Sequence, residues 1–154
     1  MFQSVIKYRI ICQHCKKAKD SARDNCFSIV ANPLKTTRAQ SITQGIENDM
    51  QDDSVDGWLC NNCVKNVTAT RRGLIRDAPE ILLLQINRFR PLVSGRIAKI
   101  SAKVSFEEDL DLTPHLETHQ KVAGETLHYQ LVAVIVHCGA TTKAGHYKSY
   151  VNKH

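Results

Sequence analysis

The chain has 154 residues, of which 42% are hydrophobic and 23% are charged, and its formal net charge is +6. These values are typical of one ordinary globular domain and exclude a disordered or fibrous chain. No apolar run approaches the roughly 20 residues that cross a bilayer, and the first residues lack the plan of a secretory signal. We therefore expect a soluble cytoplasmic or nuclear protein, whose scattered basic residues form a solvated surface.

The first half of the chain is predicted to contain two strands and one helix. Residues 4–11 mix β-branched and aromatic residues and lead into Cys12-Gln13-His14-Cys15, which indicates a strand that enters a metal site. A second strand is expected through residues 26–30, ended by Asn32-Pro33. From residue 36 to residue 50 the apolar positions recur with helical spacing, and Thr36 or Thr37 is a candidate N-cap. The residues of this apolar stripe are Ala39, Ile42, Ile46 and Met50.

The second half is predicted to be mostly strands. Residues 51–57 are acidic and rich in turn formers, which favours a loop before Trp58, and residues 64–75 suit a return strand. A break is expected at Ala78-Pro79, and the apolar run 81–84 within residues 80–89 suits a strand covered on both faces. Short strands are expected near residues 97–106, and residues 129–137 with 145–151 give the strongest hairpin signal. The fold class is therefore α+β, mostly antiparallel β.

Four of the six cysteines form two CxxC pairs, and 44 residues lie between them. Such pairs supply a complete tetrahedral set of thiolates for one structural zinc ion. The ligands are Cys12, Cys15, Cys60 and Cys63. A disulfide framework is the alternative, but it is typical of short secreted chains. Iron is a second alternative, yet the glycine common after each pair in such sites is replaced by Lys16 and Val64. We favour zinc and expect His14 to lie outside the ligand set.

Three blocks of the sequence resemble the ubiquitin-specific proteases, which are papain-like cysteine deubiquitinases. Residues 78–89, APEILLLQINRF, resemble the family's strand LPxxLxLxLKRF, with Asn87 where lysine is usual. Residues 129–139 and 145–151, YQLVAVIVHCG and GHYKSYV, resemble the family's histidine box. The paired CxxC motifs resemble the zinc ribbon at the tip of the family's fingers subdomain.

The resemblance implies a fold and a site. Residues 1–77 would be a fingers-like zinc ribbon with one helix, and residues 78–154 a palm-like β region. The family's thumb subdomain would be absent, and the palm would expose an apolar face that normally packs on it. His146 would be the general base of a thiol protease, while Gly145 and Tyr147 would line the channel for the glycine-terminated tail of ubiquitin. Ubiquitin and ubiquitinated proteins would be the partners, without a membrane or nucleic acid.

Two parts of the family's catalytic triad have no match in these residues. Nothing resembles the cysteine box GNTCYxN, and the Asp or Asn that follows the histidine box would come after His154. Cys138 stands where the family has a small residue, usually Ser, so we expect a partly buried packing thiol there and a core thiol at Cys26. The sequence thus predicts that the chain alone does not cleave ubiquitin conjugates. A non-catalytic ubiquitin-binding module and, after it, a zinc-ribbon nucleic-acid module are the alternatives.

Overall fold

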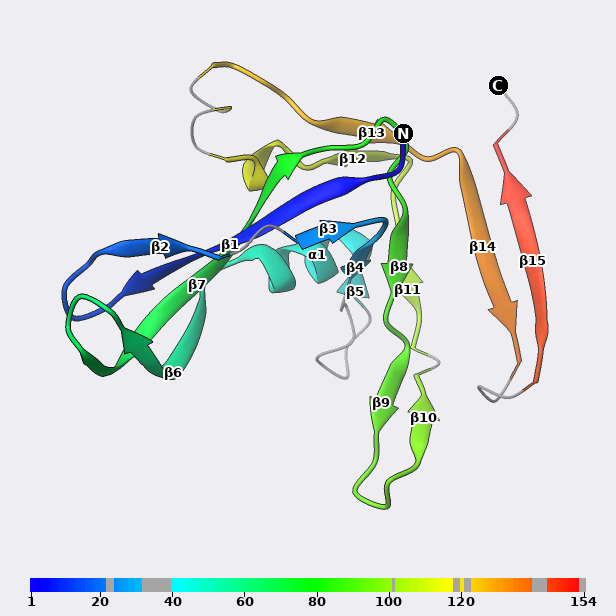
Figure 1. Cartoon of the computed structure of the whole chain (residues 1–154). Coiled ribbons are helices and arrows are strands. Elements are labelled where there is room, and N and C mark those ends of the chain that lie inside the picture. The colour runs from blue at the N-terminus through cyan, green and yellow to red at the C-terminus, as the bar shows by residue number, and fades with distance from the viewer. Residues whose placement is uncertain are drawn as a thin grey trace.

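The computed structural model describes residues 1–21, 24–31, 40–100, 102–117, 120, 123–139 and 144–152. Among these residues, no helix is long and apolar enough to span a membrane. The largest element is a five-stranded sheet in the order β2-β1-β7-β6, with β3 also paired to β1 (Figure 1). Its strands are β1 (Ser4–Cys12), β2 (Ala18–Asp20), β3 (Asp24–Cys26), β6 (Asp53–Cys60) and β7 (Lys65–Asp77). All pairings within this sheet are antiparallel.

Among the elements whose bounds the structure describes, the others are the helix α1, a 3-10 turn and five two-stranded pairs. They are β4 (Ile29–Ala31), β5 (Gln40–Ser41), α1 (Ile42–Met50), β8 (Leu84–Ile86), β9 (Phe89–Pro91), β10 (Ile97–Lys99), β11 (Val104–Ser105), β12 (Asp109–Asp111), η1 (Thr113–His115), β13 (His128–Gln130), β14 (Ala133–Cys138) and β15 (His146–Val151). The pairs β4–β8 and β5–β11 are parallel, and the other three are antiparallel. The predicted α+β class, mostly antiparallel, is confirmed.

The predicted acidic loop at residues 51–57 is wrong, because β6 begins at Asp53 and pairs with β7. Acidic side chains are tolerated in this edge strand because the arginines of β7 pair with them. The carboxylate of Asp53 lies 3.1 Å from Arg71, and Asp52, just before the strand, lies 2.7 Å from Arg72. The turn former Gly57, with φ of +70°, lies within the irregular pairing between Val55 and Trp58, so it makes a bulge.

The helix is shorter than predicted. It begins at Ile42, and the N-cap is Ser41, whose hydroxyl accepts a hydrogen bond from the backbone N–H of Gln44. The cap at Thr36 or Thr37 is therefore wrong, because residues 40–41 pair with β11 as a strand before the helix starts. The predicted inward positions Ile46 and Met50 are buried. Residues 32–39, with the predicted strand end at Asn32-Pro33, lie outside the described residues.

Three predicted strands are shorter or interrupted. Residues 26–30 are divided between β3 and β4. In the segment 80–89 the strand β8 covers only Leu84–Ile86, and it is not covered on both faces, since its central residue Gln85 is exposed. The predicted strand 129–137 breaks at residues 131–132, where the N–H of Leu131 donates to the carbonyl of Glu108 and the chain passes from β13 to β14.

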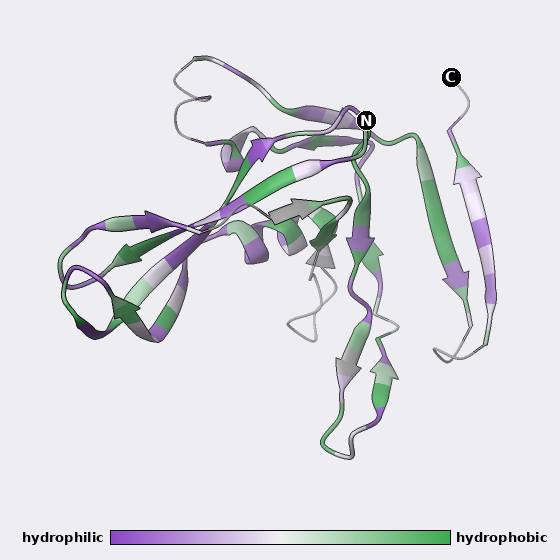
Figure 2. Cartoon of the chain, in the orientation of Figure 1, coloured by the Kyte–Doolittle hydropathy of each residue, from purple (hydrophilic) through white to green (hydrophobic). Residues whose placement is uncertain are grey.

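One hydrophobic core joins α1, the inner end of β1 and β7, and the segment around η1. Its buried members are Ile6, Ile29, Ala31, Ile46, Met50, Ile75, Leu112 and Leu116, and Cys26 packs against them while half-buried. The turns that follow β1 and β6, and the hairpin β14–β15, lie away from this core on opposite sides of the molecule (Figure 1). The hairpin β14–β15 stands apart, and Figure 2 shows that β14 is hydrophobic along most of its length. Cross-strand pairing places Ile135 of β14 on the same face as Tyr147 and Val151 of β15. These residues are 74%, 76% and 68% exposed, so the expected exposed apolar face is present.

Candidate functional site

The two CxxC pairs lie at the same end of the large sheet. The strands β1 and β6 both run antiparallel to β7, which lies between them, so they run parallel to each other and end side by side. Cys12 ends β1 and Cys60 ends β6, and each is followed by a tight turn that returns the second cysteine of its pair. Strand pairing therefore brings together two segments that are remote in sequence.

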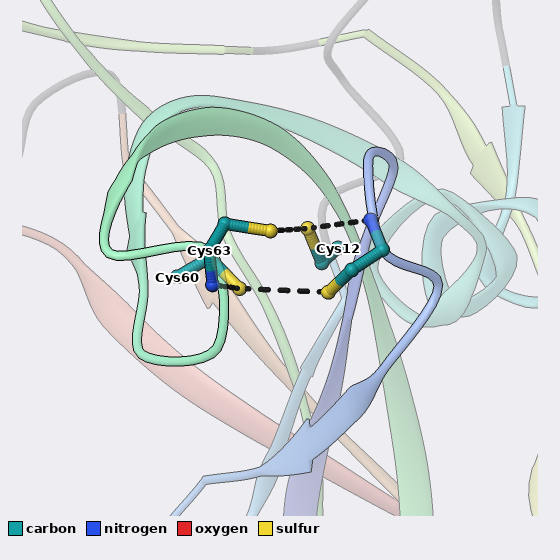
Figure 3. Close-up of side chains that lie close together, drawn as sticks. Cys12, Cys60 and Cys63 are labelled. Atoms are coloured by element: carbon teal, nitrogen blue, oxygen red, sulfur yellow. Dashed lines mark hydrogen bonds between the residues drawn. The ribbon is translucent and has the colours of Figure 1, made fainter.

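The four sulfurs form a compact cluster. The Sγ of Cys12 lies 3.8 Å from that of Cys63, and Cys15 lies 3.8 Å from Cys60. All four ligand atoms lie within 4.8 Å of one another, and Figure 3 shows the sulfurs of Cys12, Cys60 and Cys63 converging between the two turns. A tetrahedral ion with Zn–S bonds of about 2.3 Å holds its sulfurs about 3.8 Å apart. The predicted cluster is confirmed, and its geometry fits a metal of this size.

The protonation of the cluster also favours a cation. The backbone N–H of Lys17 lowers the pKa of Cys15 to about 6, while burial, together with the neighbouring thiols, raises the pKa of Cys63 to about 12. No cysteine of the six, all of which lie in the described residues, forms a disulfide. Thiols so close together cannot all ionise unless a positive charge compensates them, and a divalent metal ion supplies that charge.

The two turns are alike in backbone conformation. The N–H of Lys16 donates to the carbonyl of Cys12 over 2.9 Å, and the N–H of Val64 donates to that of Cys60 over 2.8 Å. The same two residues have positive φ, +60° at Lys16 and +52° at Val64. These are the two positions after the cysteine pairs at which glycine is common in iron sites. Each turn therefore needs a left-handed backbone conformation at this position, although lysine and valine disfavour that conformation.

His14 lies beside the cluster, between Cys63 and Lys65, the first residue of β7. Its Nδ1 is 3.5 Å from the sulfur of Cys63, and its Nε2 is 3.2 Å from the ammonium of Lys65. An ammonium has only donors, so Nε2 accepts and the ring proton sits on Nδ1, from which it is donated to the sulfur. Sequence analysis placed His14 outside the ligand set but did not identify this contact.

The histidine-box residues lie on the β14–β15 hairpin. Cys138 pairs with His146 and His137 pairs with Tyr147. Side chains alternate between the two faces of a strand, so His146 and Cys138 share one face and Tyr147 and His137 share the other. His146 is exposed, and Tyr147 is 76% exposed. The structure thus places the candidate base and the candidate channel residue Tyr147 next to each other in sequence but on opposite faces.

The structure explains why position 145 is a glycine, which sequence analysis did not. A Cβ atom at this position would collide with Nε2 of His137 and would lie 2.7 Å from the carbonyl oxygen of Cys138. The missing side chain therefore makes room for the imidazole of His137 just before the candidate base. At the facing position, a Cβ on Gly139 would lie 2.6 Å from the carbonyl oxygen of Ala144. The backbones at the end of β14 and the start of β15 therefore lie too close together for side chains at these two positions.

Two further features of this hairpin differ from expectation. Cys138 is exposed, so the prediction of a partly buried packing thiol is wrong, because the hairpin projects from the core (Figure 1).

Sequence analysis also missed Lys99 at the end of β10. Its ammonium donates to Nδ1 of His137 over 3.2 Å, to the carbonyl of His137 over 3.2 Å, and to the carbonyl of Gly139. No motif spacing points to this lysine, because the contact depends on how β10 lies against the hairpin.

Comparisons with known proteins agree with the three sequence blocks. A protein-family model described as ubiquitin carboxyl-terminal hydrolase matches residues 1–154. Ubiquitin carboxyl-terminal hydrolase 17-like protein D of Mus musculus is 34% identical over 98% of this chain and 26% of its own length. Ubiquitin carboxyl-terminal hydrolase 42 of Homo sapiens is 32% identical over 98% of this chain and 11% of its own length. The chain therefore spans about a quarter or less of these relatives.

Solved structures show the same fold. The SAGA Ubp8/Sgf11/Sus1/Sgf73 DUB module bound to ubiquitin aldehyde contains a chain that matches with a TM-score of 0.84 at 20% identity, over 99% of this chain and 34% of that one. A variant of the same SAGA DUB module bound to monoubiquitin matches with a TM-score of 0.84 at 19% identity, over 98% of this chain and 33% of that one. The resemblance found in the sequence is confirmed, and this chain belongs to the ubiquitin carboxyl-terminal hydrolase family.

Proposed function

We propose that this chain is the fingers-and-palm part of a thiol-dependent ubiquitin hydrolase, with fingers at residues 1–77 and palm at residues 78–154. The family reaction is hydrolysis of the peptide or isopeptide bond at the C-terminus of ubiquitin. The observation that carries the proposal is His146, an exposed imidazole at the start of β15, in a chain that the family model matches from residue 1 to residue 154. Ubiquitin and ubiquitinated proteins are the proposed partners, and the cytoplasm or nucleus the proposed location.

In this proposal His146 moves the proton. Its imidazole takes the proton of a cysteine thiol, so that the thiolate attacks the carbonyl carbon of the last glycine of ubiquitin. The imidazolium then gives the proton to the leaving amine, and an acyl-enzyme forms. Water, deprotonated by the same imidazole, hydrolyses that intermediate. Gly145 and Tyr147 are proposed to border the path of the ubiquitin tail, which the 76% exposure of Tyr147 permits.

The nucleophile is proposed to come from outside these 154 residues, since none of them matches the family's cysteine box. Cys138 is the one alternative that the geometry raises, because it is exposed and lies directly across from His146. Side chains in such a pair have Cβ atoms about 4.5–5.5 Å apart. The structure records no hydrogen bond between these two described side chains, so we propose that Cys138 is not the nucleophile and that the chain alone is inactive.

Zinc is the proposed metal, bound by Cys12, Cys15, Cys60 and Cys63. Four protein ligands leave no open position for water or substrate, which makes the site structural. When bound, the ion supplies the positive charge that lets all four thiols ionise. The residues themselves clamp the ends of β1 and β6, which lie on either side of β7 in the sheet.

Ubiquitin carrying a C-terminal electrophile tests the proposal directly. The 154-residue chain is expected to bind ubiquitin, measured by calorimetry, and to form no covalent adduct, measured by mass spectrometry. An adduct that disappears with Cys138→Ala would overturn the inactive assignment. In a longer protein that contains this chain, His146→Ala is expected to lower kcat by at least about 100-fold with ubiquitin affinity unchanged.

A non-catalytic ubiquitin-binding module remains the second candidate, favoured by the lack of a cysteine box in these residues. It predicts ubiquitin binding without turnover in the longer protein as well. It also predicts that His146→Ala changes neither binding nor any measured rate. Turnover that depends on His146 would reject it.

A further inference from the structure

Lys99 connects the strand β10 to the hairpin β14–β15. It ends β10, and its ammonium reaches three acceptors on β14 and just after it: Nδ1 and the carbonyl of His137, and the carbonyl of Gly139. An ammonium has three protons, so these three bonds use its full donor capacity. Lys99 and His137 are both half-buried, which strengthens such charge-assisted bonds relative to exposed ones.

The hairpin depends on this lysine for its attachment. The hydrogen bonds that the structure records from residues 133–139 and 144–151 to other described parts of the chain all come from the Lys99 ammonium. The hairpin has only two strands, and Ile135 and Tyr150 are largely exposed. A two-stranded hairpin is marginally stable by itself in water. Loss of the Lys99 bonds should therefore loosen the hairpin relative to the core.

The contacts continue from Lys99 to the residue before the candidate base. Because the ammonium only donates, Nδ1 of His137 accepts and the ring proton sits on Nε2. The Nε2 edge of the ring occupies the space where a side chain of Gly145 would be. The ring of Tyr147 lies against His137 with centroids 5.0 Å apart. The imidazole of His137 is thus held on one side by Lys99 and supports the backbone at Gly145 on the other.

This support lies on the face of the hairpin opposite His146. Cross-strand pairing places His137 with Tyr147 on one face and Cys138 with His146 on the other. Contacts behind the strand can therefore fix the backbone that carries His146 while its imidazole stays accessible. We propose that Lys99 is a positioning residue, which fixes the His146 end of the hairpin through His137. The proposal rests on the proposed function of His146, and it deepens that function.

Hydrogen exchange on the zinc-loaded 154-residue chain tests the proposal without ubiquitin. Lys99→Met, which keeps the side-chain length but removes the donors, is expected to speed amide exchange in residues 133–139 and 144–151 about tenfold. Lys99→Arg keeps the charge and donors and is expected to retain most of the protection. Lys103→Met is the matched control, since Lys103 is exposed and the structure records no hydrogen bond from it to a described residue.

Imidazole nitrogen signals give a second measurement that needs no variant. The unaltered chain is expected to show His137 with its proton on Nε2, and Lys99→Met is expected to shift both this signal and that of His146. The proposal is overturned if His137 carries its proton on Nδ1, or if Lys99→Met behaves like Lys103→Met. It is also overturned if exchange rises equally in β1 and β7, because Lys99 would then support the whole fold. A failure of the proposed function would be seen in a separate assay, if the longer protein that contains this chain still cleaved ubiquitin conjugates after His146→Ala.

Discussion

Val64 is the residue at which a single substitution is expected to stabilise the metal-binding end. It follows the second cysteine pair and has φ of +52°, in the left-handed region. In that region Cβ approaches the following carbonyl oxygen, and β-branching makes the position still less favourable. Val64→Gly removes Cβ and leaves the backbone bond from its N–H to the carbonyl of Cys60, which is 2.8 Å long.

The size of the effect follows from two opposing terms. A left-handed conformation costs a residue with a side chain about 1–2 kcal/mol. Glycine loses more backbone freedom on folding, which offsets about 0.5–1 kcal/mol of the gain. Val64 is 82% exposed, so its side chain contributes little burial that could be lost. The free energy of unfolding should rise by about 0.5–1 kcal/mol, or about 0.3–0.5 M in the urea midpoint.

Urea unfolding of the zinc-loaded chain, followed by tryptophan fluorescence, measures this change. Trp58 is the only tryptophan of the sequence and lies in β6, next to the second turn. Val64→Ala is the matched control, because it trims the side chain but keeps Cβ. The strain argument fails if Val64→Ala stabilises as much as Val64→Gly, or if Val64→Gly lowers the midpoint.

Three further results are expected at the same end of the molecule. Replacing Cys60 and Cys63 together by Ser should abolish zinc binding in a chelator titration and lower Tm by at least about 10 °C, whereas retained zinc would contradict the four-cysteine site. His14→Ala removes the proton donated to Cys63 and should speed zinc transfer to a chelator about tenfold, and an unchanged rate would show that the contact is incidental. Arg9, followed by Lys7, holds the pKa of the Asp20 carboxyl well below its usual range. Because the folded pKa is the lower one, Asp20 stabilises the fold above its unfolded pKa of about 3.9 and loses this contribution as pH falls toward the folded value. The Asp20→Asn variant should therefore be less stable than the original protein at pH 5, and the difference in their free energies of unfolding should shrink as pH falls to 2. A difference that stays constant with pH in urea titrations would contradict this.

The parts of the structure that the sequence predicts well are those whose geometry is local or chemically constrained. Each CxxC pair defines its own turn, and thiolates at this spacing have one common use, so the cluster could be predicted across 44 intervening residues. The strands β1 and β7 and the hairpin β14–β15 follow from β-branched and aromatic residues in long runs. Such patterns depend little on what the rest of the chain does.

The parts that the sequence predicts poorly depend on a partner elsewhere in the fold. The acidic segment that starts β6 becomes a strand because Arg71 and Arg72 of β7 lie beside its carboxylates. The helix starts late because Gln40 and Ser41 pair with β11, more than sixty positions along the chain. Lys99 carries no signal of its own, since a lysine in a short strand is ordinarily a solvated side chain. Its contacts arise only from the placement of β10 against β14.

The cysteine cluster and His146 differ in how firmly the rest of the fold supports them, and this difference has a functional consequence. The cysteine cluster is built on the strands of the largest sheet, and its ligands come from strands that β7 already joins. His146 instead lies on a two-stranded hairpin outside the core, where hydrogen bonds from one ammonium link the described residues of β14 to β10. Local opening is easiest where a segment has few such attachments. Loss of the metal should therefore affect the fingers first, whereas the placement of the candidate base depends on Lys99 and His137. If His146 acts as the proposed base, a change at either residue should alter its proton transfer without contact with it, because the His137 ring lies against the backbone at Gly145, next to His146.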